Sequence, residues 1–207
     1  MPTIVNDFNA VAVASNKLTT FTRLFGHAIS FPEFTTDYAT AKDWVGDGAL
    51  IVSRSLLRAS GGRGMAVSEE PQKSVDGVPT QMWVKYKRKS REYRVHVFKG
   101  RAIDTQQKRR MSGFDADAQI RNRDNGWVYT RRGVLEHPEI PMVQAQAILA
   151  LTVLELDFGA VDVIYSAKKN RCWVLEVNCA PGLEGQTIES YSNAIRGFAN
   201  ENNSERR

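Results

Sequence analysis

The sequence feature that most constrains this chain is a pair of apolar, β-branched segments near its C-terminal end. Residues 160–165 and 172–177 form the two segments, and the polar run Lys168–Asn170 separates them. Two short segments of this kind around a polar turn are typical of a β-hairpin. We therefore expect the C-terminal part of the fold to be built on antiparallel strands.

The hairpin brings acidic and amide side chains together. A turn centred on Lys169 places Asp162 directly opposite Glu176, and Asn178 lies two residues further along the face that Glu176 occupies. Two opposed carboxylates repel each other, and a hard divalent cation such as Mg²⁺ would remove that repulsion. The alternative is a solvated sheet face on which the acids pair with lysine or arginine. The hairpin alone favours neither interpretation.

The rest of the chain mixes short strands and helices and has no internal repeats. A glycine-rich segment, Ser60–Gly64, separates two of the strands, and residues 106–132 read as loops with a short strand at 127–129. The expected helices are 16–26, with Ser15 as N-cap, 37–45, 142–156 and 188–198, and the other expected strands are 49–53, 65–67, 82–86 and 93–98. Residues 199–207 read as a flexible tail.

Composition narrows the class of partner. A net charge of +5 favours an anionic ligand, whether a nucleotide, an acidic metabolite or nucleic acid. The two cysteines do not make a disulfide framework, and the sequence shows no signal peptide and no apolar run long enough for a membrane span. We expect a cytoplasmic protein without membrane contact. No cysteine–histidine cluster suggests zinc, and His96 is expected to be structural.

Residues 174–185, Val-Leu-Glu-Val-Asn-Cys-Ala-Pro-Gly-Leu-Glu-Gly, resemble the C-terminal signature of ATP-grasp carboxylate–amine ligases, especially the RimK-like branch. Residues 159–162 resemble the strand that precedes this signature in the family. The resemblance implies that Asp162, Glu176 and Asn178 bind the Mg²⁺, or Mn²⁺, ions that bridge the phosphates of ATP. It covers residues 15–185, most of the chain.

Other residues fall in the order that the family follows. The resemblance implies that Lys17 faces the nucleotide, that Arg54 replaces the lysine that usually meets the α- and β-phosphates, and that the Ser60–Gly64 loop closes over the phosphates. It implies further nucleotide contacts from the loop glycines, the interlobe hinge, an acid that meets the ribose and a lysine near the γ-phosphate: Gly61, Gly62, Gly64, Trp83, Lys85, Tyr86, Glu92 and Lys108. The run Lys85–Lys89 could equally be a solvated hairpin tip.

The resemblance also implies a domain organisation, with two α+β lobes and the nucleotide in the cleft between them. The ATP-grasp domain would span 15–198, with a smaller lobe at about 49–84 and a larger lobe at about 85–198, after a short lead at 1–14. Relatives usually carry a separate N-terminal domain. Here we expect that domain to be absent or to be supplied by another chain, either a different protein or a second copy in a homo-oligomer.

One departure concerns catalysis. Some relatives place an arginine two residues before the metal-binding aspartate, where this chain has Ala160. Arg121 or Arg123 could take that catalytic role and stabilise negative charge. The implied reaction joins a carboxylate to an amine through an acyl phosphate, with release of ADP and phosphate. Neither substrate is named by the sequence, and the acceptor could be a macromolecule.

Two other classes of function stay open. The basic stretches 85–91 and 108–123, followed by Trp127 and Tyr129, could track phosphates and stack bases in a nucleic-acid-binding module. That interpretation gives no reason for Asp162 to face Glu176. The expected absence of the N-terminal domain would also suit a non-catalytic ATP-binding subunit of a larger complex.

Overall fold

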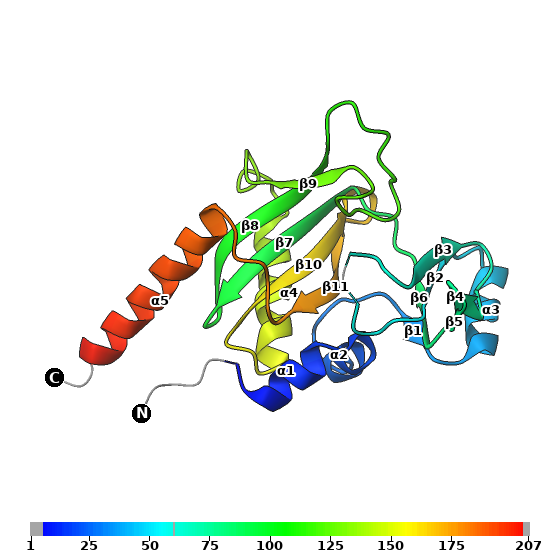
Figure 1. The fold of residues 1–207 in the computed structure, drawn as a ribbon, viewed down its shortest axis with the longest axis horizontal. Coiled ribbons are helices and arrows are strands. Elements are labelled where there is room, and N and C mark those ends of the chain that lie inside the picture. Colours follow the sequence, from blue (N-terminus) through cyan, green and yellow to red (C-terminus); the bar gives the residue numbers. More distant parts are fainter. Residues whose placement is uncertain (1–5, 60, 205–207) are drawn as a thin grey trace.

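A computed structural model describes residues 6–59 and 61–204. The chain forms two antiparallel sheets that lie side by side, with a helix-covered larger sheet at one end and a smaller sheet at the other (Figure 1). We refer to the part built on the smaller sheet as the small lobe and to the part built on the larger sheet as the large lobe. This mixture of helices and antiparallel sheets is the α+β class that the sequence predicts.

The small lobe is a four-stranded sheet in the order β1-β6-β2-β3. Its strands are β1 (Phe34–Thr35), β6 (Met82–Lys85), β2 (Ile51–Arg54) and β3 (Met65–Ser68), and a two-stranded ribbon of β4 (Ser74–Val75) and β5 (Val78–Pro79) lies beside them. Alternation along β6 sends Trp83 to the face covered by α3 (Tyr38–Gly46), and Met82 and Val84 to the other face.

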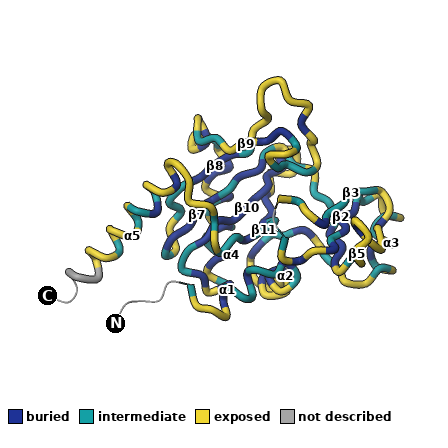
Figure 2. The backbone as a smooth tube through the Cα atoms, viewed as in Figure 1, coloured by how far each residue is buried: buried dark blue, intermediate teal, exposed yellow. Residues whose placement is uncertain are grey.

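The large lobe is a five-stranded sheet in the order β11-β10-β7-β8-β9. Its strands are β7 (Arg91–Phe98), β8 (Arg101–Arg110), β9 (Trp127–Thr130), β10 (Phe158–Ser166) and β11 (Arg171–Asn178). One face is covered by α4 (Ile140–Val153), whose Val143, Ala147 and Leu151 are buried. Figure 2 shows the buried residues following the strands of this sheet.

Period-two alternation decides which side chains reach the site. Tyr93, Val95 and Val97 of β7 are fully buried in the core with α4. Glu92 and Arg94, the residues on either side of Tyr93, therefore face the opposite side of the sheet. The same alternation in β10 buries Val161 and Val163 against α4 and turns Asp162 away from it. In the middle of these two strands the odd-numbered residues face the core and must be apolar. The even-numbered residues face the other side of the sheet and can be polar.

The hairpin pairs Asp162 with Glu176 as expected, but by a different route. Next to the turn the register pairs Ile164 with Trp173, which would place Leu175 opposite Asp162. A β-bulge between Asp162 and Val163 shifts the register by one residue, so that Asp162 meets Glu176 instead. The predicted turn centre at Lys169 was therefore wrong, although the predicted pair is confirmed.

Several predicted boundaries need correction. Residues 8–14, expected as part of an irregular lead, form helix α1 (Phe8–Ala14). Helix α2 (Lys17–Leu24) is capped by Asn16 rather than Ser15, because the Asn16 side chain accepts hydrogen bonds from the backbone of Leu18 and Thr19. Strand β8 extends into the region expected as loops, to Arg110.

Three further differences concern the last helix, the segment 86–90 and strand β1. The last helix, α5 (Gln186–Ser204), continues beyond residue 198, into the stretch expected as a flexible tail. The segment 86–90 joins two different sheets, so the run Lys85–Lys89 is no hairpin tip. Strand β1 also joins the smaller sheet from upstream of the range 49–84 expected for the smaller lobe. Within residues 6–59 and 61–204, no helix has the length and apolar character needed to cross a membrane.

Candidate active site

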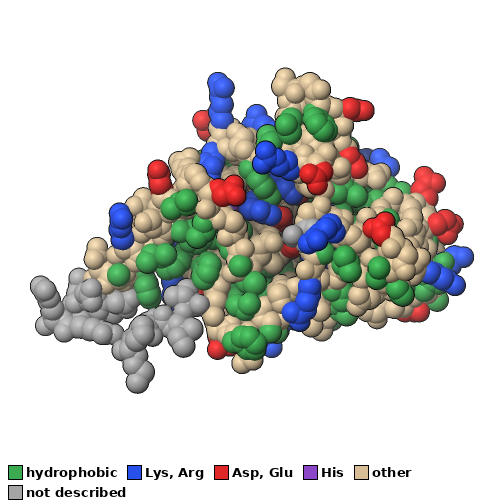
Figure 3. Space-filling view, in the orientation of Figure 1, with side chains coloured by type: hydrophobic (Ala, Val, Ile, Leu, Met, Phe, Trp, Pro, Cys, Tyr) green, Lys and Arg blue, Asp and Glu red, His purple; other side chains and the backbone are tan. Residues whose placement is uncertain are grey.

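A cleft of about 600 Å³ lies between the two lobes. Its lining combines apolar side chains of both sheets with a large excess of positive charge. Among the described residues that line it, ten are lysine or arginine and three are carboxylates: Glu92, Asp162 and Glu176. Figure 3 shows lysine and arginine side chains gathered over the middle of this face, with carboxylates recessed among them. Such a surplus suits a polyanion.

Asp162 lies on the cleft face of β10 and is held by an arginine that sequence reasoning missed. Arg94, its partner across β7, donates from Nε to Oδ1 at 2.7 Å and from Nη2 to Oδ2 at 2.8 Å. Lys108 Nζ lies 3.9 Å from Oδ2. Burial by itself would raise the pKa of Asp162, but Arg94 and Lys108 outweigh it and hold the pKa below the usual range. Asp162 is therefore ionised at neutral pH.

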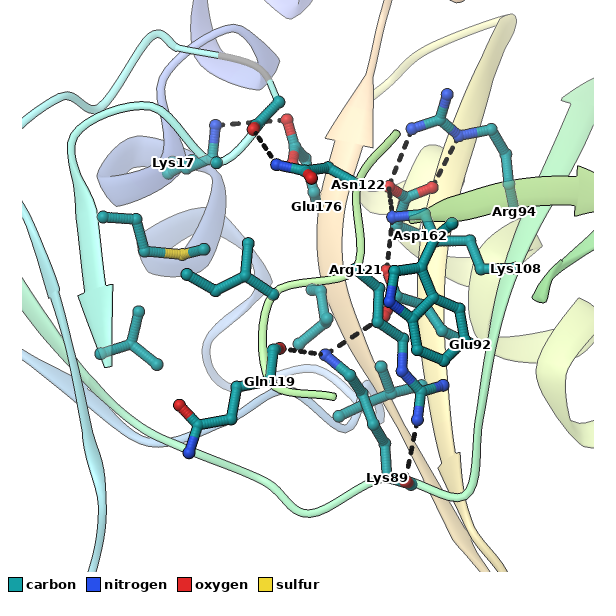
Figure 4. A pocket seen from close by; sticks show the side chains of 18 of the residues that line it. Lys17, Lys89, Glu92, Arg94, Lys108, Gln119, Arg121, Asn122, Asp162 and Glu176 are labelled. Carbon is teal, nitrogen blue, oxygen red and sulfur yellow. Dashed lines mark hydrogen bonds and ion pairs between the residues drawn. The ribbon is translucent and has the colours of Figure 1, made fainter. Parts of the chain in front are cut away.

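Glu176 has its own cation, Lys17. Lys17 Nζ lies 3.2 Å from Glu176 Oε1 and donates a hydrogen bond of 2.6 Å to the carbonyl of Ala59, at the start of the glycine-rich loop. Lys17 is the first residue of α2, so the start of this helix delivers the ammonium group to the floor of the cleft. The lysine thus joins the large-lobe carboxylate to the small-lobe loop (Figure 4).

Asn178 completes the expected ligand set. It lines the cleft, and its buried Nδ2 finds no hydrogen-bond partner among the described residues. Two carboxylates and one amide oxygen on neighbouring strands are the hard oxygen donors that Mg²⁺ prefers when phosphates supply further ligands. No group of three or more His, Cys, Asp or Glu side chains that could hold a metal occurs in the described part of the chain. The donor set therefore fits a cation that shares its coordination with a substrate.

Of the small-lobe residues that the sequence predicts to face phosphates, Arg54, Gly61 and Gly62 line the cleft. Arg54 ends β2 and lines the cleft, and burial lowers its pKa while Glu176 opposes that effect. Gly61 and Gly62 also line the cleft, with φ of +70° and +83°. Ser60, predicted as part of this loop, lies outside the described residues. Gly64 is not among the lining residues and instead makes the close turn back into β3.

The glycine-rich loop touches the large lobe. The carbonyl of Gly61 accepts a hydrogen bond of 2.6 Å from Asn122 Nδ2, in the loop between β8 and β9. A Cβ added at Gly62 would lie 3.1 Å from Cγ2 of Ile120 in the same loop. The two loops therefore meet over the cleft and bridge the lobes there.

The expected hinge is only partly in place. Lys85 and Tyr86 line the cleft, as does Val84. The Trp83 side chain does not: it is 6% exposed, stacks edge-on against Tyr38 and donates to the carbonyl of Gln72 on the far face of the sheet. Alternation along β6 requires this, because Val84 takes the cleft side and Trp83 the other.

Glu92 is held by two lysines at the opposite end of the cleft from Lys17. Lys108 Nζ lies 2.6 Å from Oε1 and Lys89 Nζ lies 3.2 Å from Oε2. Burial lowers the pKa of Lys89, and the charge of Glu92 opposes that effect. Lys89 also donates to the carbonyl of Gln119 (Figure 4). Sequence reasoning had Glu92 and Lys108 but missed Lys89, which looked like part of a solvated basic run.

The two predicted catalytic arginines occupy different settings. Arg121 stacks its guanidinium 4.4 Å from the centre of the Trp127 ring and donates to the carbonyl of Lys89. Burial lowers its pKa. Arg123 is exposed but still lines the cleft. Neither forms an ion pair with Asp162 or Glu176 in the described structure, whereas Arg94 does. Arg94 could have been found by its alternation with Glu92 on one strand.

His96 takes a structural position on the same sheet face. It is 2% exposed, and its Nδ1 lies 3.4 Å from the hydroxyl of Tyr191 on α5. Asp104, its cross-strand partner, is held by Arg131 through contacts of 2.9 and 2.6 Å. This polar cluster lies under the first turns of α5 and fastens that helix to the sheet.

No family model matches the chain, and no curated protein matches it. The fold, in contrast, is widely shared among solved structures.

Three solved structures define the class of fold. D-alanine–D-alanine ligase from Bacillus anthracis has a TM-score of 0.67 and 14% identity over 93% of this chain. N5-carboxyaminoimidazole synthetase from Staphylococcus aureus, complexed with ADP, has a TM-score of 0.64 and 13% identity over 87% of this chain. The ATP-grasp ligase PsnB, complexed with minimal precursor, Mg and ADP, has a TM-score of 0.58 and 15% identity over 87% of this chain.

The chain has the ATP-grasp fold. It spans 65% of the length of the D-alanine–D-alanine ligase, 54% of PsnB and 49% of the synthetase. This chain therefore shares its overall architecture with those proteins.

Proposed function

We propose that this chain is an ATP-dependent ligase that joins a carboxylate to an amine through an acyl phosphate. The observation that carries the proposal is the pairing of Asp162 with Glu176 across the β10–β11 hairpin, inside a cation-rich cleft between the lobes. Asp162 is buried and Glu176 is half-buried, and a divalent cation bound with phosphates between them would offset the repulsion of the two carboxylates. The ATP-grasp fold supports the same conclusion.

The nucleotide would lie along the cleft, with its base among apolar side chains of both sheets. Val52, Val84, Ile164 and Leu175 supply that surface. Lys85 and Tyr86 border it, and Glu92, flanked by Lys89 and Lys108, would face the sugar or the phosphates. Lys17, Arg54 and the glycine-rich loop would bind the phosphate chain at the other end, where backbone N–H groups and cations suit phosphate oxygens.

Asp162, Glu176 and the Asn178 amide oxygen would hold Mg²⁺, which when bound neutralises charge on the phosphates. The protein's own part is positioning and charge compensation. A substrate carboxylate attacks the γ-phosphorus of ATP, the bond to the β,γ-bridging oxygen breaks, and ADP leaves. An amine then attacks the acyl carbon, phosphate departs with the electron pair of the C–O bond, and the amine loses a proton. Cations at this end of the cleft, including Arg94, would balance the negative charge that develops.

Peptides bound to two of the similar structures suggest which acceptor substrates to test. PsnB was solved with a precursor peptide, and the macrocyclase MdnC from Microcystis aeruginosa was solved bound with its precursor peptide MdnA. Peptides therefore belong beside amino acids among the acceptors to be tried. A partner chain, or a second copy of this one, could contribute to the acceptor site.

The test is an assay of ADP release with ATP and Mg²⁺ across pools of amino acids, carboxylic acids, peptides and nucleic acids. We expect one pool to stimulate ADP release by the wild type, and Glu176→Ala to abolish that stimulation. Glu189→Ala, which removes an exposed acid on α5 outside the cleft, is the matched control and should behave as wild type. Failure of the wild type to bind Mg·ATP would overturn the proposal, and a stimulated activity that survives Glu176→Ala would remove the metal site from it.

The positions of the basic residues argue against a module that binds a nucleic-acid duplex. Lys89, Lys108 and Arg121, from the two basic stretches, line the cleft and contact Glu92 or Trp127. Cations turned into a cleft cannot follow the phosphates of a duplex on an outer surface.

A further inference from the structure

Both carboxylates that would hold the metal are already neutralised by the protein itself. Arg94 on β7 forms two hydrogen bonds, of 2.7 and 2.8 Å, with the two oxygens of Asp162. Lys17 on α2 lies 3.2 Å from Glu176 Oε1. Figure 4 shows the two pairs side by side at the end of the cleft.

These pairs oppose the entry of a free cation. Two-pronged arginine–carboxylate contacts are among the stronger ion pairs, and Asp162 is only 5% exposed. A metal ion at Asp162 would need an oxygen that Arg94 now occupies. It would also leave Arg94 and Lys17, whose side chains are 24% and 10% exposed, without a counter-charge in a cleft that already holds a surplus of cations. Displacing a partly buried cation from its partner is costly.

A polyphosphate removes this obstacle. Its oxygens offer Arg94 and Lys17 new hydrogen-bond partners. When the two cations turn to the phosphates, Asp162 and Glu176 become free to bind the metal. Lys17 also donates to the carbonyl of Ala59, at the base of the glycine-rich loop, so its transfer to a phosphate would free the loop as well.

We propose that Arg94 and Lys17 are internal counter-cations that exclude the divalent metal until a nucleotide polyphosphate occupies the cleft. Metal and nucleotide then bind with positive cooperativity. Arg94 and Lys17 pair with the carboxylates before the nucleotide binds and with its phosphates afterwards. This proposal rests on the proposed function, because it presumes a nucleotide and a metal in this cleft.

The experiment is a titration of the full chain with Mn²⁺, followed by the electron paramagnetic resonance signal of free Mn²⁺, with and without a non-hydrolysable ATP analogue. A titration of the analogue without protein corrects for their complex in solution. For the wild type we expect weak binding of Mn²⁺ alone and an affinity at least about tenfold higher with the analogue. Arg94→Gln should bind Mn²⁺ alone about tenfold more tightly than the wild type, with a smaller gain from the analogue.

Two further variants guard the interpretation. Lys17→Gln should shift Mn²⁺ affinity in the same direction through Glu176, so the test does not depend on one substitution folding well. Arg109→Gln makes the same change in net charge one residue from Lys108, on an exposed side chain that contacts Gln107 rather than the carboxylates, and should leave Mn²⁺ binding unchanged. In Arg94→Gln/Asp162→Asn the gain in Mn²⁺ affinity should disappear. A thermal unfolding curve of each variant establishes that it is folded.

Two results would overturn the inference while leaving the proposed function intact. One is equal affinity of the wild type for Mn²⁺ with and without the analogue. The other is unchanged binding of Mn²⁺ alone in folded Arg94→Gln and Lys17→Gln, with the analogue still bound. If the wild type binds neither the analogue nor Mn²⁺, the proposed function itself fails, and this inference fails with it.

Discussion

His96 shows how one side chain can be polar, buried and yet outside the chemistry. It sits among groups from three elements: Asp104 and Gln106 on β8, Arg131 beyond β9, and Tyr191 on α5. Burial lowers the pKa of His96 to about 4, with the charge of Asp104 opposing that effect. The imidazole is therefore neutral in the folded protein over most of the physiological range.

This histidine makes stability depend on pH. In the unfolded chain its pKa is about 6.5, so between about pH 6.5 and 4 the unfolded state binds a proton that the folded state does not. The sign follows: the free energy of unfolding falls as the pH drops through this window. We expect His96→Gln to flatten that part of the profile, as measured by urea unfolding at pH 7, 6, 5 and 4. His27→Gln, on an exposed histidine, should keep the wild-type slope. Equal slopes in wild type and His96→Gln would contradict this assignment.

At the scale of elements, the glycine-rich loop shows that neighbouring glycines have different reasons to be glycine. Gly61 and Gly64 both have positive φ, +70° and +63°, which strains any other residue. A Cβ at Gly61 would meet nothing within 4 Å, whereas one at Gly64 would lie 2.6 Å from Cγ of Leu56 and 2.9 Å from Oγ of Ser55. Backbone conformation alone constrains the first, and packing also constrains the second.

The two alanine substitutions should therefore separate these effects. Gly61→Ala should lower the free energy of unfolding by about 1 kcal/mol, the cost of a left-handed alanine. Gly64→Ala should lower it by a further 1–3 kcal/mol or so, because Leu56 and buried Ser55 must move. Chemical denaturation of both variants measures the difference. If the two variants are equally stable, packing at Gly64 contributes nothing.

At the scale of the whole molecule, the cleft depends on contacts that bridge two sheets. The small-lobe loop meets the large-lobe loop through Asn122 and Gly61, and Lys17 ties the carbonyl of Ala59 to Glu176. These few polar contacts span the opening through which a ligand must pass. A small number of bridging hydrogen bonds allows the cleft to open at low cost, as the nucleotide binding that we propose would require.

Removing the Asn122 contact should loosen the closed cleft. We expect Asn122→Ala to weaken binding of a non-hydrolysable ATP analogue about two- to tenfold, the equivalent of one hydrogen bond. The increase in the dissociation constant should come mainly from a higher dissociation rate, which stopped-flow displacement of a fluorescent analogue measures. Asn193→Ala, on the exposed side of α5, is the control and should match the wild type. An unchanged dissociation rate in Asn122→Ala would mean that the contact does not hold the cleft shut.

Much of the fold could be predicted because its strands and helices follow local sequence patterns. Residues 93–98 and 160–165 were expected as strands, in which side chains alternate with period two, and the polar turn identified the hairpin neighbour of the second strand. The same alternation, applied to Glu92, would have identified Arg94. Helix α1 was missed because Phe8, its largest apolar side chain, is 81% exposed, so its seven residues carry little helical periodicity.

The pairing of Asp162 with Glu176 divides these two kinds of information. The sequence shows that side chains alternate along each strand of the hairpin, because strands have a side-chain period of two, but it does not fix which residues of the two strands oppose each other. The packed structure brings the two acids opposite each other through a β-bulge, which the residues of the turn do not predict. It also decided that Trp83 turns away, that Lys89 is buried and that Arg94 holds Asp162. Those outcomes depend on which sheets pack together, and burial beside an opposite charge is a property of the packed molecule rather than of any segment.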